Sequence, residues 1–325
     1  MLIPSDPFLF SVVIPTYNRP ERLLKCLEAL TQQTLSTDCW EVIIVDDGSQ
    51  ESLESVAATV RSHIQIHLIR QSNTGPATAR NTGAANASGR YLVFTDDDCQ
   101  PLPDWLEQFA RKFEQKTEGL IGGHTLNALP QNIYSTASQL LIDYLYKYYN
   151  SPPREATFFA SNNFAAPREI YQKLGGFDTS FPLAAGEDRE FCDRWLQHGY
   201  SMDYASEAQI NHAHELTLRS FWRQHFNYGR GAFHFHQVRA KRDAGKIEVE
   251  PLSFYSNLLI YPFLQETHKS KLLLSGLFVL SQVANLMGFF WERFNQLSEP
   301  TPPKRLAAKE EEVQLKAEKI PSERS

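Results

Sequence analysis

The chain lacks the two glycine-rich sequences that most readily identify nucleotide-binding proteins. No Gly-x-Gly-x-x-Gly follows the first apolar strand pattern, and no Gly-x-x-x-x-Gly-Lys occurs in the 325 residues. These absences exclude the usual dinucleotide-binding and P-loop modes of phosphate recognition. Any nucleotide that this protein binds must be held by other groups.

Cysteine is scarce, and positive charge is not in excess. The four cysteines, Cys26, Cys39, Cys99 and Cys192, have no metal-type spacing, so we expect reduced thiols rather than a disulfide framework. The formal net charge of −6 gives no indication of nucleic-acid binding. The first ten residues lack the basic and apolar regions of a signal peptide, which predicts a cytoplasmic protein.

Apolar strand patterns alternate with helical patterns through the first hundred residues. The strand patterns cover residues 10–15, 41–45, 64–69 and 91–95. Continuous apolar runs of this length are typical of strands buried on both faces, as in a parallel sheet. The alternation predicts an α/β fold with a doubly wound, mostly parallel sheet.

Acidic residues follow two of these predicted strands. Asp46 and Asp47 end the second strand, and Asp96, Asp97 and Asp98 directly follow the fourth. Because parallel strands end at one edge, where α/β sheets bind ligands, we expect both groups to lie together. Three adjacent carboxylates raise the cost of ionising one another, and Mg²⁺ or Mn²⁺ would relieve this repulsion. A solvated acidic turn is the alternative.

Four motifs, in this order, resemble those of family 2 glycosyltransferases. They are VVIPTYNR at 12–19, VDDGS at 45–49, GPATARNTG at 75–83 and DDD at 96–98. The resemblance covers roughly residues 10–215 and implies the GT-A fold. It also implies a nucleoside-diphosphate sugar as donor and a divalent metal at the Asp-x-Asp motif.

The resemblance implies roles for individual residues by their position in these motifs. The implied donor-binding residues are Pro15, Tyr17, Asp46, Asp47, Arg80, Asp96 and Asp97. Asp47 would contact the nucleobase, and Asp96 would contact the ribose or sugar. Asp98 would ligate the metal that bridges the two phosphates. For Arg80, a structural salt bridge is the alternative.

Two later segments complete the site that the resemblance implies. Glu187 and Asp188 precede an apolar helical stripe, where acids are favoured for helix capping alone. The family has its general base at the Asp of such a pair, which implies Asp188 as the base with Glu187 beside it. A histidine completes the metal site in many GT-A enzymes. We favour His212 over His214, because only one of them would point inward from a strand.

The second half of the chain contains a basic region and then an apolar one. A helical pattern from 219 to 246 carries seven Lys or Arg residues and is interrupted at 229–231. Residues 272–291 carry no charge, and their length just reaches that of a membrane span. This segment has a polar stripe of Ser275, Ser281, Gln282 and Asn285, which favours an amphipathic helix at the membrane face. A packed helix or a true span is the alternative.

These features predict a GT-A catalytic domain over 8–215, a basic and apolar helical extension over 216–297, and a charged, disordered tail over 298–325. The expected activity is metal-dependent, inverting transfer of a sugar to a hydroxyl of a glycan or lipid-linked acceptor. The expected location is the inner face of the cell membrane, with an anionic membrane surface as a partner and no nucleic acid. A nucleotidyltransferase and a non-catalytic nucleotide-sugar- or glycan-binding protein are the alternatives.

Overall fold

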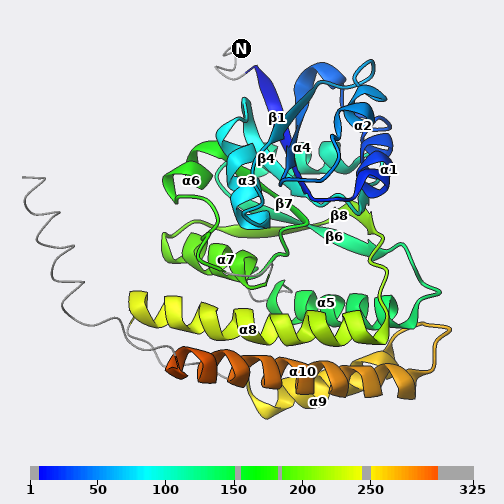
Figure 1. Ribbon diagram of the computed structural model, residues 1–325, viewed down its shortest axis with the longest axis vertical. Coiled ribbons are helices and arrows are strands. Elements are labelled where there is room, and N and C mark those ends of the chain that lie inside the picture. Colours follow the sequence, from blue (N-terminus) through cyan, green and yellow to red (C-terminus); the bar gives the residue numbers. More distant parts are fainter. Residues whose placement is uncertain (1–6, 151–154, 182–184, 244–249, 299–325) are drawn as a thin grey trace, which may run out of the picture.

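The computed structural model describes residues 7–150, 155–181, 185–243 and 250–298. One eight-stranded sheet has the order β3-β2-β1-β4-β7-β6-β8-β5, and long C-terminal helices lie below it in Figure 1. The strands are β1 (Phe8–Thr16), β2 (Trp40–Asp46), β3 (Ile66–Arg70), β4 (Gly89–Thr95), β5 (Cys99–Pro101), β6 (Leu120–Asn127), β7 (Asn163–Pro167) and β8 (Met202–His212). The charged tail lies outside the described residues from position 299 onward.

The helices divide into those of the sheet region and those of the C-terminal extension. The first group is α1 (Pro20–Leu30), α2 (Glu54–Ala58), α3 (Pro76–Ala85), α4 (Trp105–Gln115), α5 (Ile133–Asn150), α6 (Arg168–Lys173) and α7 (Glu187–Gln197). The second group is α8 (Leu218–Asp243), α9 (Leu252–Ile260) and α10 (Lys271–Ser298). Short 3₁₀ turns are η1 (Thr37–Cys39) and η2 (Tyr261–Leu264).

The first four strands form the parallel half of the sheet, as predicted. β1 pairs in parallel with β2 and β4, and β2 pairs in parallel with β3. The sheet then changes direction, because β7 is antiparallel to both β4 and β6. The reversal lies next to β4, whose end carries the three aspartates.

Two apolar clusters fill the two faces of the sheet. Successive residues of a strand point to opposite faces, and accordingly Val12 belongs to one cluster and Val13 to the other. Helices α1, α2 and α4 cover the first face. Helices α3, α6 and α7 cover the second. The strand ends remain free of these covering helices and can carry polar groups.

The extension is built on α8, and the predicted interruption of this helix is wrong. α8 is continuous through Gly229 and Gly231. These glycines permit close backbone approach instead: a Cβ on Gly229 would lie 1.9 Å from the Asn285 oxygen of α10, and one on Gly231 would lie 2.1 Å from the Ala185 oxygen before α7. Figure 1 shows α8 lying between α7 and α10.

A third apolar cluster joins the extension to the sheet region. It contains Leu141 and Tyr144 of α5, Phe221 of α8, Phe254 of α9 and Phe278 of α10. The Tyr144 hydroxyl also donates a hydrogen bond to the Phe254 carbonyl at 2.6 Å. The extension is therefore packed against the sheet region rather than connected to it by a linker alone.

Candidate active site

The two acidic groups lie at one edge of the sheet, as predicted. β1 and β2 end level, with Thr16 opposite Asp46. The Thr16 hydroxyl donates a 2.8 Å hydrogen bond to Asp97, which follows β4. Three parallel strands thus bring carboxylates from two distant segments into one site.

Asp47 holds the loop that leads into α3. Its carboxylate accepts hydrogen bonds from the Gln71 side chain at 2.8 Å and from the backbone N–H groups of Thr74 at 3.0 Å and Gly75 at 2.8 Å. Of these bonds only the one from Gly75 goes to Oδ2, so this oxygen retains an acceptor position. Neighbouring Asp46 accepts a 2.8 Å bond from the Ser49 N–H.

Of the other two residues that the first motif assigns to donor binding, Pro15 is buried and Tyr17 is exposed. Pro15 lies in β1 directly opposite Val45 of β2. Tyr17 follows the end of β1, with 46% of its surface exposed. Its ring is accessible to a ligand at this edge of the sheet.

Arg80 connects the aspartates after β4 with the acidic pair of α7. Its guanidinium lies 2.7 Å from Asp96 Oδ1 and 3.5 Å from Glu187 Oε1. Burial opposes the charged form, yet the nearby carboxylates of Asp96 and Glu187 raise the pKa of Arg80. The ion-pair interpretation and the active-site interpretation of Arg80 therefore describe the same contact.

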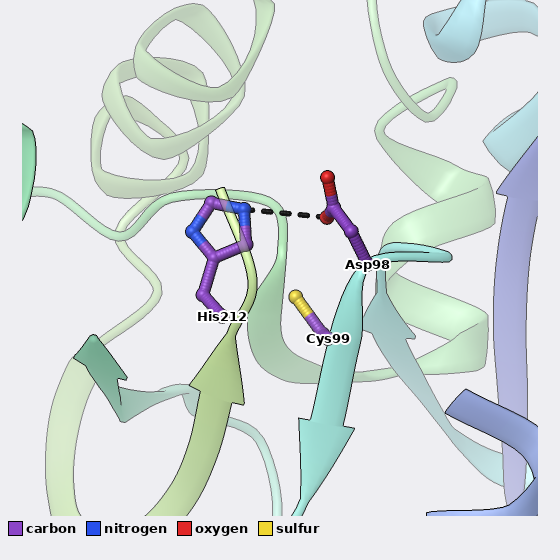
Figure 2. A group of neighbouring side chains, drawn as sticks. All are labelled: Asp98, Cys99 and His212. Carbon is purple, nitrogen blue, oxygen red and sulfur yellow. Dashed lines mark ion pairs between the residues drawn. The ribbon is translucent and has the colours of Figure 1, made fainter. Parts of the chain in front are cut away.

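Asp98 and His212 meet at the opposite side of the aspartate triplet. His212 Nε2 lies 3.2 Å from Asp98 Oδ1, and Figure 2 shows the two side chains facing each other above Cys99. Arg22 lies 3.1 Å from the other oxygen of Asp98. Burial favours the neutral acid, but the hydrogen bond and charge of His212 hold the pKa of Asp98 below its usual value.

Asp97 takes a different direction from its two neighbours. It bonds Thr16 and lies 3.2 Å from the Arg19 guanidinium. Burial, followed by the charge of Asp98, raises the pKa of Asp97 to about 6. Arginines thus compensate part of the repulsion within the triplet.

The two candidate histidines differ in position. β8 ends at His212, so strand alternation does not extend to His214. The two rings stack with centroids 4.9 Å apart, and His212 is the one placed against Asp98. Burial and the charge of His212 lower the pKa of His214 to about 4.

A carboxylate and an imidazole nitrogen in contact fit a divalent cation by their chemistry. Asp98 is buried, and the His212 side chain keeps 19% of its surface exposed. The corner is therefore open to a ligand on the histidine side. These two residues are the ones that the motif and the His-x-His segment indicated.

Glu187 and Asp188 form the first turn of α7. Gly186 precedes them with φ of 93°, a conformation that favours glycine. Burial raises the pKa of both carboxyl groups. Within the described residues, Glu187 Oε2 is buried without a hydrogen-bond partner. The pair can therefore accept a proton at a pH where exposed carboxyl groups are fully ionised.

Sequence reasoning missed three side chains at this site. Arg19 and Arg22 contact the aspartates, and their position directly after the first strand was an available signal. Tyr228 of α8 is 40% exposed. Desolvation, together with the charges of Asp188 and Glu187, raises the pKa of Tyr228 to about 12. No local motif identifies Tyr228, because packing of α8 brings it here.

Comparison with known proteins agrees with this geometry. Residues 11–175 match glycosyl transferase family 2. The glycosyltransferase AglE of Haloferax volcanii is 30% identical over 204 residues, which span 62% of this chain and 65% of AglE. The O-antigen chain rhamnosyltransferase WbaN of Salmonella anatum is 28% identical over 243 residues, spanning 73% of this chain and 75% of WbaN.

Solved structures share the fold. The mannosyltransferase PcManGT from Pyrobaculum calidifontis, in complex with GDP-Man and Mn²⁺, aligns with a TM-score of 0.57 at 21% identity and covers 96% of this chain and 82% of that one. S. aureus TarS aligns with a TM-score of 0.51 at 17% identity, covering 86% and 54%. The chain belongs to glycosyl transferase family 2 and has the GT-A fold.

Proposed function

We propose that this protein is a metal-dependent, inverting glycosyltransferase. It moves a sugar from a nucleoside-diphosphate sugar to a hydroxyl of a glycan or lipid-linked acceptor. One observation carries the proposal: Arg80 contacts both Asp96 at the donor edge, at 2.7 Å, and Glu187 at the start of α7, at 3.5 Å. The acids for donor binding and the acids for proton removal therefore belong to one site.

The donor is held at the ends of the first strands. The open lone pair of Asp47 accepts a base N–H, beside Pro15, Tyr17 and Asp46. Asp96 accepts a hydroxyl of the ribose or sugar, since its carboxylate remains partly exposed while it bonds Arg80.

The leaving diphosphate is placed at the corner of Asp98 and His212. These residues would hold Mn²⁺ or Mg²⁺, which neutralises developing charge on the leaving group when bound. Arg19 lies 3.7 Å and Arg22 3.1 Å from Asp98 Oδ2, so both guanidinium groups belong to the same corner, and such groups bind phosphate oxygens well. The corner thus offers positive charge where a diphosphate departs.

The acceptor hydroxyl is activated by the acidic pair. Asp188 accepts the hydroxyl proton as general base, and desolvation raises its pKa and so its affinity for that proton. The oxygen then attacks the anomeric carbon from the face opposite the diphosphate, which inverts the configuration. Arg80 keeps Glu187 in place beside the base.

The test is a screen of purified protein for nucleoside-diphosphate release across a panel of nucleotide sugars. We expect one donor class to be used, with release accelerated by a hydroxyl acceptor. The product's anomeric configuration, measured by proton NMR, should be opposite to that of the donor. No release from any donor, or retention of configuration, would refute the proposal.

The C-terminal helices support membrane attachment. The polar stripe of α10 faces the protein: Ser281 is fully buried, Ser275 bonds the Leu259 carbonyl at 2.8 Å, and Asn285 packs on Gly229. The opposite side is apolar and exposed. We call this side the outer apolar face; its main members are Leu272, Leu286, Phe290 and Trp291 of α10.

We propose that the outer apolar face lies on an anionic inner leaflet, with α10 parallel to the surface. Among the described helices, Lys271–Gln296 alone is long and apolar enough to cross a membrane. Yet α10 packs along α8, with Arg230 Nε bonding Glu292 Oε2 at 2.6 Å, and crossing would separate the two helices. A helix lying in the interface fits this arrangement and suits a lipid-linked acceptor.

A further inference from the structure

The strand register places a sulfur atom beside the proposed metal ligands. Cys99 begins β5 and lies directly opposite His212 of β8 in antiparallel pairing. Side chains directly opposite on antiparallel strands point to the same face, with Cβ atoms roughly 4.5–5.5 Å apart. Figure 2 shows the Cys99 thiol directed into the space between His212 and Asp98.

The three side chains can converge on one ion. One ligand atom from each of Asp98, Cys99 and His212 lies within 4.8 Å of the others, and the Asp98–His212 contact is already 3.2 Å. Cys26 provides an internal comparison, because it is equally buried in the same apolar cluster and is not a member of this group. Burial in the core therefore does not by itself account for the placement of the Cys99 sulfur.

The mixed ligand set has a consequence for metal choice. Oxygen and imidazole ligands suit Mg²⁺ and Mn²⁺, whereas thiolate sulfur selects thiophilic ions such as Zn²⁺. Zinc takes four tetrahedral ligands, so three protein ligands would leave one position for water or a phosphate oxygen. A carboxylate, a thiolate and a neutral imidazole also balance the charge of a dication, which a buried site requires.

We propose that Cys99 is a third ligand of this site for thiophilic divalent cations. Zn²⁺ then binds through Asp98, Cys99 and His212, while Mn²⁺ or Mg²⁺ uses Asp98 and His212. The inference rests on the proposed function, which assigns a metal to these two residues. As the metal–sulfur bond forms, the thiol loses its proton to solvent and no electron is transferred. Zn²⁺ and Mn²⁺ consequently compete for one site.

The test uses the full chain with Co²⁺ as a spectroscopic probe for zinc-type binding. Bound Co²⁺ should give a near-ultraviolet sulfur-to-metal charge-transfer band, which added Zn²⁺ removes. Cys99→Ser should abolish the band. It should also weaken Zn²⁺ binding by at least about 10-fold, because losing even a residue that only hydrogen-bonds to a metal ligand usually costs that much affinity. Mn²⁺ binding, measured by electron paramagnetic resonance, should stay unchanged in this variant.

Two matched controls separate the proposed ligand from the other thiols. Cys26→Ser removes a buried thiol of the same core, and Cys39→Ser removes a more accessible one; both should keep the band. His212→Ala should lose the band although Cys99 is intact. This variant keeps the test valid if Cys99→Ser fails to fold.

The outcomes distinguish the two claims. A wild-type protein that binds Mn²⁺ through Asp98 but shows no charge-transfer band with Co²⁺ overturns the role of Cys99 alone. A band that survives in Cys99→Ser overturns it equally. A protein that binds neither ion, with Asp98→Asn indistinguishable from wild type, refutes the metal site of the proposed function as well.

Discussion

At the scale of single residues, the chemistry depends most on Asp188. Asp188→Asn keeps the shape of the side chain and removes its basicity. We expect kcat to fall by roughly 10²–10⁴-fold, the usual contribution of general base catalysis, while donor affinity stays nearly unchanged. Steady-state kinetics and donor titration measure the two effects. Asp38→Asn, at an exposed position, is the control. If turnover of the Asp188 variant is near normal, Asp188 is not the general base and its role is helix capping alone.

The pH dependence of turnover reports on the same pair. Burial raises the pKa of Glu187, and the charge of Asp188 raises it further; burial likewise raises the pKa of Asp188. The base works only when ionised, so kcat/KM should fall as pH decreases through these raised values, above the range of exposed carboxyl groups.

Glu187→Gln tests this assignment. It removes one of the two interacting charges and should move the acid limb of the profile to lower pH, because the remaining carboxyl group then ionises more easily. Lys116 and half-buried Asp203, at the start of β8, form an ion pair away from this site, so Asp203→Asn serves as the control and should leave the limb in place. An acid limb that moves to higher pH, or stays fixed in Glu187→Gln, would contradict the assignment.

The aspartate triplet shows how far sequence reasoning reaches at this scale. The strand pattern placed Asp96, Asp97 and Asp98 at the ligand-binding edge, since strand ends follow from local apolar runs. The strand pattern could not predict which side chain each aspartate contacts, because Arg80 and His212 come from distant segments of the chain. Sequence reasoning therefore predicted that a divalent metal would relieve the repulsion within the triplet, whereas the fold also supplies arginines.

At the scale of elements, glycine contacts hold α10 against α8. A Cβ on Gly288 would lie 1.9 Å from the Phe226 oxygen, and neither backbone can yield easily. Gly288→Ala should therefore destabilise the fold by roughly 1–3 kcal/mol, as overpacking does. Urea-induced unfolding measures this change.

Gly276 of the same helix is the matched control. A Cβ there has no atom within 4 Å, so Gly276→Ala should stabilise the helix by roughly 0.5–1 kcal/mol. Equal effects of the two substitutions would show that helix propensity, and not the close contact, controls the stability of this pair.

The helices also show what periodicity leaves undetermined. Residues 229–231 looked like an interruption because glycine disfavours helix interiors, but here the missing side chains allow two backbone contacts. The polar stripe that the sequence predicts on 272–291 lies on the side of α10 that faces the protein. The stripe faces α8 and α9, where Asn285 lies over Gly229 and Ser275 bonds the Leu259 carbonyl, while the exposed apolar residues of α10 face outward.

At the scale of the whole molecule, the outer apolar face predicts binding to anionic vesicles. Wild-type protein should float with anionic liposomes. Burial of the apolar side chains in the membrane adds to an electrostatic attraction of about 1 kcal/mol for each Lys or Arg near the anionic surface. Leu286→Glu, at a position 60% exposed on this face, should reduce flotation. Leu218→Glu, at a position 51% exposed at the start of α8, should float as wild type does. If the protein stays at the bottom of the gradient in every case, the outer apolar face would instead be a binding surface for another protein.

The dependence of transfer on a divalent cation tests the central claim most directly. Nucleoside-diphosphate release from the preferred donor should stop in excess chelator and return when Mn²⁺ or Mg²⁺ is added back. Asp98→Asn should need much more metal for the same rate, because the carboxylate that faces His212 is lost. Full transfer activity in excess chelator would contradict metal-dependent catalysis at this site.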